Sequence, residues 1–243
     1  MAKILIAGLG KGIKKDGKYR ETNYSIEKID KENIIYKNES FITSALEKHF
    51  EIDKTIYIGT VGSRWDNLYS YYCNKYNLKE DEDYTFELLE ASSNATQDSE
   101  FSEINIKKFN DIFEGKARII LTKFGMNTNE IFENFNLIME IGNMLNDGDE
   151  IYLDITHSFR SNAMWMFLVI NYITNVLDKN VEVKMISYGM FEAKYKKEVI
   201  ENGETKEIEI SPVVNLKAFF DLMKWIKGAN ELKNYGNSYT ILE

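Results

Sequence analysis

The chain has 243 residues, 44% of them hydrophobic and 28% charged, with a formal net charge of −9. This length can bury a large core, and the composition excludes a disordered or fibrous protein. The acidic balance argues against non-specific nucleic-acid binding, duplex DNA included, because such binding needs an excess of cations.

Nothing in the sequence points to a membrane or to secretion. No apolar stretch is long enough to span a bilayer, and the N-terminus lacks a signal-peptide layout. The single cysteine, Cys73, excludes an internal disulfide framework and is typical of a reducing compartment. We therefore expect a cytoplasmic protein with no membrane partner.

Five short apolar runs are typical of buried strands. They cover residues 4–7, 56–58, 118–121, 151–155 and 181–187. Helical patterns lie between or beside them, at residues 41–50, 65–76, 104–113, 129–145 and 162–177. This alternation predicts an α/β fold with a Rossmann-like, doubly wound, mostly parallel sheet and helices on both faces.

The pattern changes in the C-terminal part of the chain. Segments at residues 188–195 and 206–214 flank Asn202-Gly203, which is typical of a β-hairpin turn, and a helix is predicted over residues 216–232. Because the only proline is Pro212 and no flexible linker occurs, we expect residues 191–243 to form one unit with residues 1–190.

The turn after the first predicted strand is rich in glycine. Open α/β sheets bind ligands at the carboxyl ends of their strands, and the amides around Gly10, Lys11 and Gly12 could receive an anion. The turn is not a dinucleotide fingerprint, because Ile13 stands where a third glycine is needed. A plain tight turn explains it equally well. Residues 11–20, however, carry five basic residues against one acid, which is unexpected in an acidic chain.

The turn after the second predicted strand combines small polar residues with an arginine and a tryptophan. They are Thr60, Gly62, Ser63, Arg64 and Trp65. Such residues suit a phosphate or sugar beside a stacked base, but a helix cap at Ser63 and a packing role for Trp65 fit equally well.

The loop after the third predicted strand contains Lys123, Gly125 and Asn127. These residue types suit a ligand-facing loop. A simple turn with a helix N-cap at Asn127 or Thr128 is slightly favoured on local grounds.

The densest polar cluster follows the fourth predicted strand, at residues 154–161. Asp154 and Thr156 alternate along the strand end, while His157 and Arg160 enter the first turn of the next helix, where free amides can receive an anion. For Asp154 alone a buried structural role is favoured. For the cluster a function is favoured, because so many polar groups are costly to bury without one.

Two other kinds of site are not supported. One cysteine and two distant histidines, His49 and His157, form no zinc motif, so no metal or other cofactor is expected. A triad of Ser158, His157 and Asp154 is disfavoured, because sequence neighbours rarely reach that geometry and no nucleophile elbow is present.

Residues 153–160, Leu-Asp-Ile-Thr-His-Ser-Phe-Arg, resemble the Asp-x-Thr-His-Gly-Phe/Leu-Arg signature of CARF (CRISPR-associated Rossmann fold) proteins of type III CRISPR systems. The segments at residues 4–10, 41–46, 59–66 and 229–237 resemble the same family in the same order. Ser158 departs from the signature, which usually has glycine there.

The resemblance implies a homodimeric sensor of cyclic oligoadenylate, the second messenger of type III CRISPR antiviral defence, with cyclic tetra-adenylate as the commonest ligand. The family's ligand contacts fall on residues 10–12, 60–65, 123–127 and 156–160. Our candidate ligand-binding residues are therefore Gly10, Lys11, Gly12, Thr60, Gly62, Ser63, Arg64, Trp65, Lys123, Gly125, Asn127, Asp154, Thr156, His157, Ser158, Phe159 and Arg160.

Members of the family are often fused to a HEPN ribonuclease effector, whose active site is an arginine followed closely by a histidine. No arginine precedes His49 or His157 at that spacing, so we expect the effector to be absent from this chain. Some CARF domains also cleave their ring without a metal. In such a ring nuclease Lys123, His157 and Arg160 would stabilise charge, and Ser158 or Thr156 would orient the reacting groups.

Two rival functions are weaker. A nicotinamide-dependent Rossmann oxidoreductase is disfavoured by Ile13 and by the lack of an acid at a suitable second-strand end. A CARF-like transcription regulator is disfavoured because the acidic chain shows no basic helix-turn-helix pattern.

Overall fold

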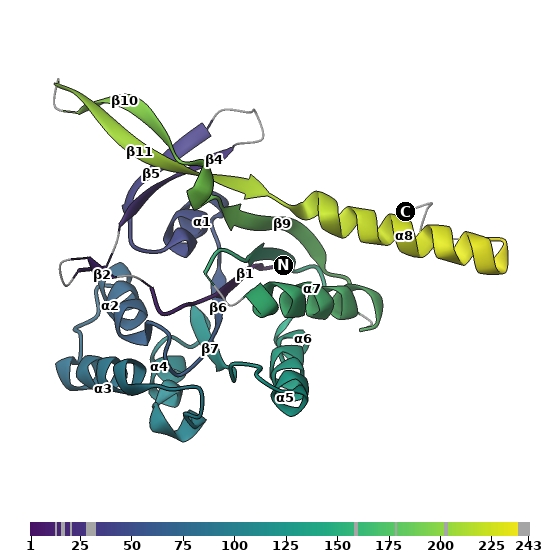
Figure 1. Cartoon of the computed structure of the whole chain (residues 1–243), viewed down its shortest axis with the longest axis horizontal. Coiled ribbons are helices and arrows are strands. Elements are labelled where there is room, and N and C mark those ends of the chain that lie inside the picture. The colour runs from purple at the N-terminus through teal and green to yellow at the C-terminus, as the bar shows by residue number, and fades with distance from the viewer. Residues whose placement is uncertain are drawn as a thin grey trace.

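The computed structural model describes residues 1–12, 14–15, 18–19, 21–27, 33–157, 160–177, 179–201 and 204–237. These residues form a nine-stranded mixed sheet with helices on both faces (Figure 1). A small two-stranded sheet lies beside it, formed by β2 (Lys14–Lys15) and β3 (Lys18–Tyr19). The α/β fold class predicted from the sequence is confirmed.

Five neighbouring strands of the sheet are parallel, and all five coincide with predicted ones. They are β1 (Lys3–Gly8), β6 (Lys54–Gly59), β7 (Ala117–Leu121), β8 (Glu150–Asp154) and β9 (Glu182–Gly189). In space their order is β9-β8-β1-β6-β7. The chain builds outward from β1 to β7 and then returns to place β8 on the other side of β1. The topological switch point, where such sheets bind ligands, therefore lies between β1 and β8.

Four further strands extend this parallel core. They are β4 (Thr22–Glu27), β5 (Asn33–Glu39), β10 (Tyr195–Glu201) and β11 (Glu204–Asn215). The long β11 pairs in turn with β10, with β4 and with β9, and so joins the hairpin to the central sheet. The sequence did not predict β4 or β5.

The predicted hairpin is present, with one correction. Its first strand is β10, not residues 188–195, because Tyr188 and Gly189 still belong to β9 and a 3-10 turn, η2 (Phe191–Ala193), follows. The predicted turn residues, Asn202 and Gly203, lie outside the described residues, but Glu201 and Glu204 pair on either side of them.

Helices cover the two faces in sequential groups, and alternate residues of each strand face them. Leu5 and Ala7 of β1 pack against a first group of helices, which precede β7 in the chain. Ile4 and Ile6 pack against a second group, which follow β7. The first group is α1 (Ile42–Phe50), α2 (Trp65–Lys75), α3 (Glu82–Asn94), the 3-10 turn η1 (Phe101–Glu103) and α4 (Ile106–Ile112). The second is α5 (Thr128–Met139), α6 (Ile141–Met144), α7 (Arg160–Asn175) and the start of α8 (Lys217–Tyr235). Of these helices, α3 was not predicted, and the helix predicted over residues 129–145 is divided into two at Glu140.

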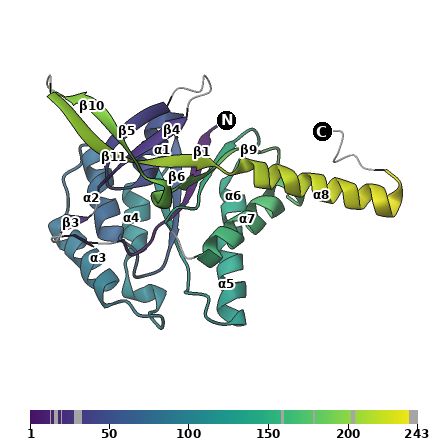
Figure 2. The same ribbon diagram turned by 45° about the horizontal axis from the view of Figure 1, so that its top comes forward.

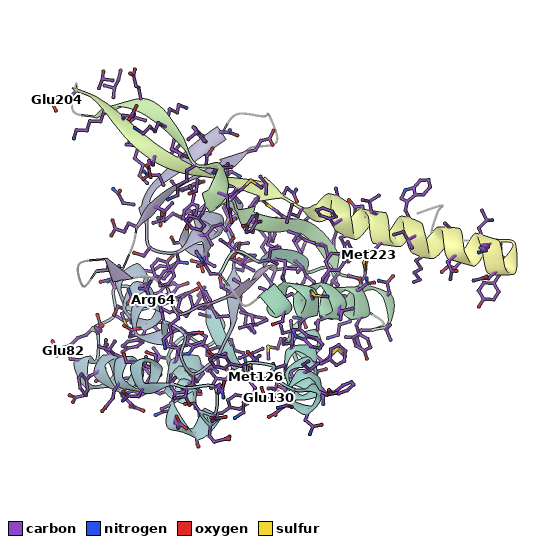
Figure 3. All side chains as sticks on the ribbon, in the orientation of Figure 1. Arg64, Glu82, Met126, Glu130, Glu204 and Met223 are labelled. Carbon is purple, nitrogen blue, oxygen red and sulfur yellow. The ribbon has the colours of Figure 1, made fainter. Side chains whose placement is uncertain are left out.

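Two elements project from the body. In both views α8 extends beyond one end of the sheet, and the β10–β11 hairpin extends beyond the other (Figures 1 and 2). The first half of α8 is fixed to α7: the rings of Phe220 and Phe167 lie 6.0 Å apart, and Met223 lies between the two helices (Figure 3).

Candidate functional site

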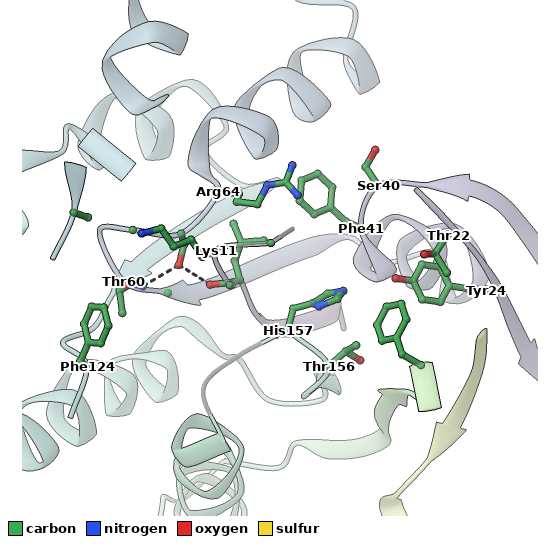
Figure 4. Close-up of a pocket in the computed structure, with 18 of the residues that line it drawn as sticks. Lys11, Thr22, Tyr24, Ser40, Phe41, Thr60, Arg64, Phe124, Thr156 and His157 are labelled. Atoms are coloured by element: carbon green, nitrogen blue, oxygen red, sulfur yellow. Dashed lines mark hydrogen bonds between the residues drawn. The ribbon is translucent and has the colours of Figure 1, made fainter. Parts of the chain in front are cut away.

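A cavity of about 770 Å³ opens at the carboxyl ends of β1, β6 and β8, beside the topological switch point. Its volume is in the range of small-molecule sites. The residues that line it, most of which Figure 4 draws, are Leu9, Gly10, Lys11, Gly12, Thr22, Tyr24, Ser40, Phe41, Gly59, Thr60, Gly62, Ser63, Arg64, Ala95, Phe124, Thr156, His157, Phe191 and Lys194. The turns after β1, β6 and β8, which were predicted separately from the sequence, therefore meet in one cavity.

The turns after β1 and β6 are tied to each other. Ser63 Oγ donates to the carbonyl of Leu9 at 2.6 Å and accepts from the amide of Thr60 at 3.1 Å. The amide of Arg64 donates to the carbonyl of Gly10 at 3.3 Å. These bonds fix the two glycine-containing turns against one another, so the cavity has a preformed floor.

Arg64 supplies a largely buried positive charge to this floor. Only 7% of the residue is exposed, and its guanidinium carbon lies 5.8 Å from the centre of the Phe41 ring. Gly12, at φ +64°, lies against the side chain of Arg64. Because most of the side chain is buried, a charge here acts on an anion more strongly than a fully exposed one would.

The end of β8 is held by a network of hydrogen bonds around Asp154, which is fully buried. Thr156 Oγ1 donates to Asp154 Oδ1 at 2.6 Å, and Ser187 Oγ donates to the same oxygen at 3.2 Å. Thr156 Oγ1 also accepts from the amide of Gly189 at 2.8 Å. Burial raises the pKa of Asp154 to about 7, although these hydrogen bonds oppose the shift. The hydroxyl of Thr156 thus holds the loop to β9.

His157 stands in the cavity wall directly after this network. Loss of solvent around the ring, and then the nearby charge of Arg64, lower the pKa of His157 to about 4. The imidazole is therefore neutral at pH 7. Its ring centre lies 5.6 Å from that of Phe191, so it contributes a flat, uncharged surface to the cavity.

Some predicted ligand residues lie away from the cavity lining. Trp65 is fully buried and donates from Nε1 to the carbonyl of Thr60 at 2.9 Å. Lys123 Nζ donates to the carbonyl of Ser99 at 3.1 Å and to Glu100 Oε2 at 2.9 Å. Asn127 caps α5, as its simpler interpretation suggested, and Gly125 lies in the same loop.

The rest of the signature is described only in part. Ser158 and Phe159 lie outside the described residues, and of Arg160 only its place at the start of α7 is described.

The cavity also has residues that the sequence did not single out. They come from β4, from the start of α1, from the end of α3 and from η2, and they are Thr22, Tyr24, Ser40, Phe41, Ala95, Phe191 and Lys194. Phe124, within the predicted range 123–127, also lines the cavity. The polar–apolar alternation of residues 22–26 is the one feature that could have pointed to β4.

In the described part of the chain, no group of three or more His, Cys, Asp or Glu residues is placed to hold a metal ion. None of the described helices is both long and apolar enough to cross a membrane.

Comparison with known proteins gives the family. Residues 4–192 match the model of the CARF domain of CRISPR system endoribonuclease Csx1. CRISPR-associated protein MJ1674 of Methanocaldococcus jannaschii is 34% identical over 261 aligned positions, which cover 99% of this chain and 38% of the relative. The chain thus spans well under half the length of that relative. Because the family model matches well over half of the chain, the chain belongs to the Csx1 CARF-domain family.

Proposed function

We propose that this chain binds cyclic oligoadenylate, with cyclic tetra-adenylate as the first candidate, and acts as a sensor in type III CRISPR defence. The observation that carries the proposal is the meeting of the β1 glycine turn, Arg64 and His157 in one cavity at the switch point. Peptide amides and a buried guanidinium suit phosphates, and flat rings suit bases. Family membership supports the same ligand class.

A ring-shaped ligand calls for two copies of the cavity, and an apolar surface next to the site suits a homodimer. Met164, Leu168 and Phe219 are 71%, 51% and 61% exposed. They border a groove of about 350 Å³ that is lined almost wholly by apolar side chains, Ile155 among them.

Leu222 and Ile226 of α8 are exposed as well, at 56% and 69%, and add further apolar side chains that a second copy could cover. The helix α7 begins three residues after His157, which lines the cavity. If two protomers met through the exposed face of α7, their cavities would therefore lie close together.

In this proposal ligand binding controls an effector, such as a HEPN ribonuclease. One route from the cavity leads outward: Thr156 is bonded to Gly189 of β9, and β9 pairs with the end of β11, from which α8 begins. A shift at the Thr156–His157 loop would therefore reach α8 through consecutive hydrogen-bonded strands.

Equilibrium binding tests the sensor directly. The chain is titrated with cyclic tetra-adenylate, with cyclic hexa-adenylate and with linear tetra-adenylate, which has similar bases and phosphates without ring closure. We expect one of the rings to bind at least tenfold tighter than the linear control. Equal binding of ring and linear forms, or no binding of either ring, rejects the sensor.

A stand-alone, metal-independent ring nuclease is the second candidate, favoured by the presence of a cation and an imidazole in the same cavity. Attack of a ribose 2′-hydroxyl on the adjacent phosphate would need Arg64 for charge stabilisation, because a neutral His157 supplies no positive charge. Incubating stoichiometric chain with cyclic tetra-adenylate in EDTA tests it. A linear product with a 2′,3′-cyclic phosphate end supports cleavage, and an intact ring rejects it.

A further inference from the structure

The strand β7 ends the sheet on one side. Among the described strands it pairs with β6 alone. The unpaired main-chain groups of such an edge strand can accept a strand of another molecule. The composition of β7 suits such pairing, because Ile119, Ile120 and Leu121 are consecutive apolar residues, two of them β-branched.

Alternate residues of β7 direct their main chain toward β6. The carbonyl of Lys116 accepts from the amide of Thr55 at 3.0 Å, and the amide of Thr122 donates to the carbonyl of Gly59 at 2.8 Å. The residues at positions 117, 119, 121 and 123 therefore direct their N–H and C=O groups to the outer edge. These are the groups that an added strand would need.

Two asparagine side chains occupy this outer edge, and we call them the amide clamps. Asn110 of α4 accepts from the amide of Ile119 at 2.7 Å and donates to its carbonyl at 3.1 Å. Asn134 of α5 makes the same two bonds with Lys123, at 2.7 Å and 2.9 Å. Because a carboxamide carries an acceptor and donors side by side, each clamp satisfies both main-chain groups of one residue, as a neighbouring strand would.

The two clamps reach the edge from opposite faces of the sheet. The helices α4 and α5 lie on either side of β7 (Figure 1), with Phe109 of α4 in the core of one face and Ile138 of α5 in the core of the other. Asn134 is 2% exposed and Asn110 is half-buried. At the start of the strand the amide of Ala117 donates to the carbonyl of Phe113 at 2.9 Å. The edge is therefore occupied at its start, its middle and its end.

We propose that the amide clamps keep the outer edge of β7 closed to a second copy of this chain. Leu121 lies between the two clamped residues, so a strand can pair beside it only by displacing a clamp. Two unclamped β7 strands could pair about a two-fold axis and join two sheets. With the edge closed, contact between copies is left to other surfaces. This inference is independent of ligand binding and goes beyond the proposed function.

Three variants separate the clamps from the other features of the strand. Asn110→Ala removes one clamp and keeps α4 helical, because alanine has the highest helix propensity. Asn110→Ala/Asn134→Ala removes both clamps. Arg118→Gln is the matched control, since it takes an exposed charge from the same strand, which also discourages edge pairing, and leaves both clamps in place. Circular dichroism checks that each variant is folded, and the half-buried single site decides the question if the double variant does not fold.

Each protein is followed by sedimentation velocity and by amide hydrogen exchange over a range of concentrations. We expect the clamp variants to form species of at least about twice the wild-type mass as the concentration rises, because each new contact joins two particles. In dilute solution the Ile119 amide should exchange about fivefold faster than in the wild type, or more, because it has lost its acceptor. Its protection should return on association, because a second strand then replaces the clamp.

The mass and the exchange rate must change together. Clamp variants that keep the wild-type mass at every concentration would overturn the proposal. So would association that leaves the Ile119 amide unprotected, since the contact would then lie elsewhere. Equal association of Arg118→Gln would show that charge on the strand, and not the amide clamps, keeps the edge closed.

Discussion

The side chain of Arg64 occupies the space that a side chain at position 12 would need: a Cβ atom on Gly12 would lie 2.3 Å from Arg64 Cδ and 2.6 Å from its Nη1. The glycine turn after β1 therefore does more than bring its backbone near a ligand. It also leaves room for the guanidinium at the cavity floor. The glycine turn and Arg64, which were predicted separately from the sequence, therefore depend on one another.

Gly12→Ala tests this dependence. The added methyl group must displace Arg64, so we expect ring binding to weaken by tenfold or more. Gly115→Ala is the matched control, because Gly115 also has a positive φ, +75°, but has nothing within 4 Å of its Cβ position. Both variants carry similar backbone strain. Isothermal calorimetry should show the loss for Gly12→Ala alone, and equal losses for the two would mean that strain, not Arg64, is responsible.

Arg64→Gln removes the buried charge. A charged hydrogen bond contributes roughly 1.5–3 kcal/mol, so ring binding should weaken by about 10- to 100-fold. It should also depend less steeply on salt, because one fewer phosphate is neutralised. Arg118→Gln, at an exposed position of β7, serves as the control for net charge. An unchanged salt slope for Arg64→Gln would show that this arginine does not meet a phosphate.

Asp154 should make folding pH-dependent. Its pKa rises from about 3.8 to about 7 on folding, so the unfolded chain loses this proton first as the pH rises. The stabilising contribution of the carboxyl group is complete below about pH 4 and is lost as the pH rises from there through about 7, a change on the order of 4 kcal/mol. Urea unfolding should therefore show wild type losing stability relative to Asp154→Asn between pH 5 and 8. Parallel pH profiles would contradict the raised pKa.

His157 should act in the opposite direction. Its pKa falls from about 6.5 to about 4 on folding, so the folded state binds fewer protons between these values. The free energy of unfolding therefore increases, because of this group, as the pH rises from 4 to 6.5. His157→Asn should lose that gain, whereas His49→Asn, which replaces the other histidine, should keep it. An NMR titration that finds the His157 ring charged at pH 6 would overturn the neutral imidazole.

The exposed face of α7 should carry the dimer contact. Met164→Glu and Leu168→Glu place a charge in it, so both variants should sediment as monomers at concentrations where the wild type is a dimer. Phe86→Glu alters an exposed phenylalanine of α3 and should leave the dimer intact. A wild type that is monomeric with and without ring, or a dimer that survives both α7 substitutions, would place the contact elsewhere.

The five parallel strands could be predicted because most of their residues are buried and form short apolar runs, although Arg118 of β7 and Glu182 of β9 are exposed. The predicted site followed from topology, since turns after strands next to the switch point converge. The same reasoning explains why Lys123 lies elsewhere: β7, which precedes it, is separated from β1 by β6 and ends the sheet on that side. Among the described residues of the loop after β7, only Phe124 reaches the cavity lining.

The part of the cavity wall that includes Tyr24, Ser40 and Phe41 could not be predicted in the same way. This wall depends on β4, which joins the sheet only by pairing with β11, nearly two hundred residues later in the chain. The polar–apolar alternation of residues 22–26 is too short to identify a strand, and the place of such a strand is set by its partner. Tyr24, Ser40 and Phe41 consequently become neighbours of His157 only in the folded protein.

Calorimetric titration of the chain with cyclic tetra-adenylate and cyclic hexa-adenylate tests the central claim most directly, because it gives affinity and stoichiometry together. We predict saturation with one of these rings at one ring per two chains. Failure of both rings to bind, or saturation at one ring per chain, would contradict a cradle shared between two protomers.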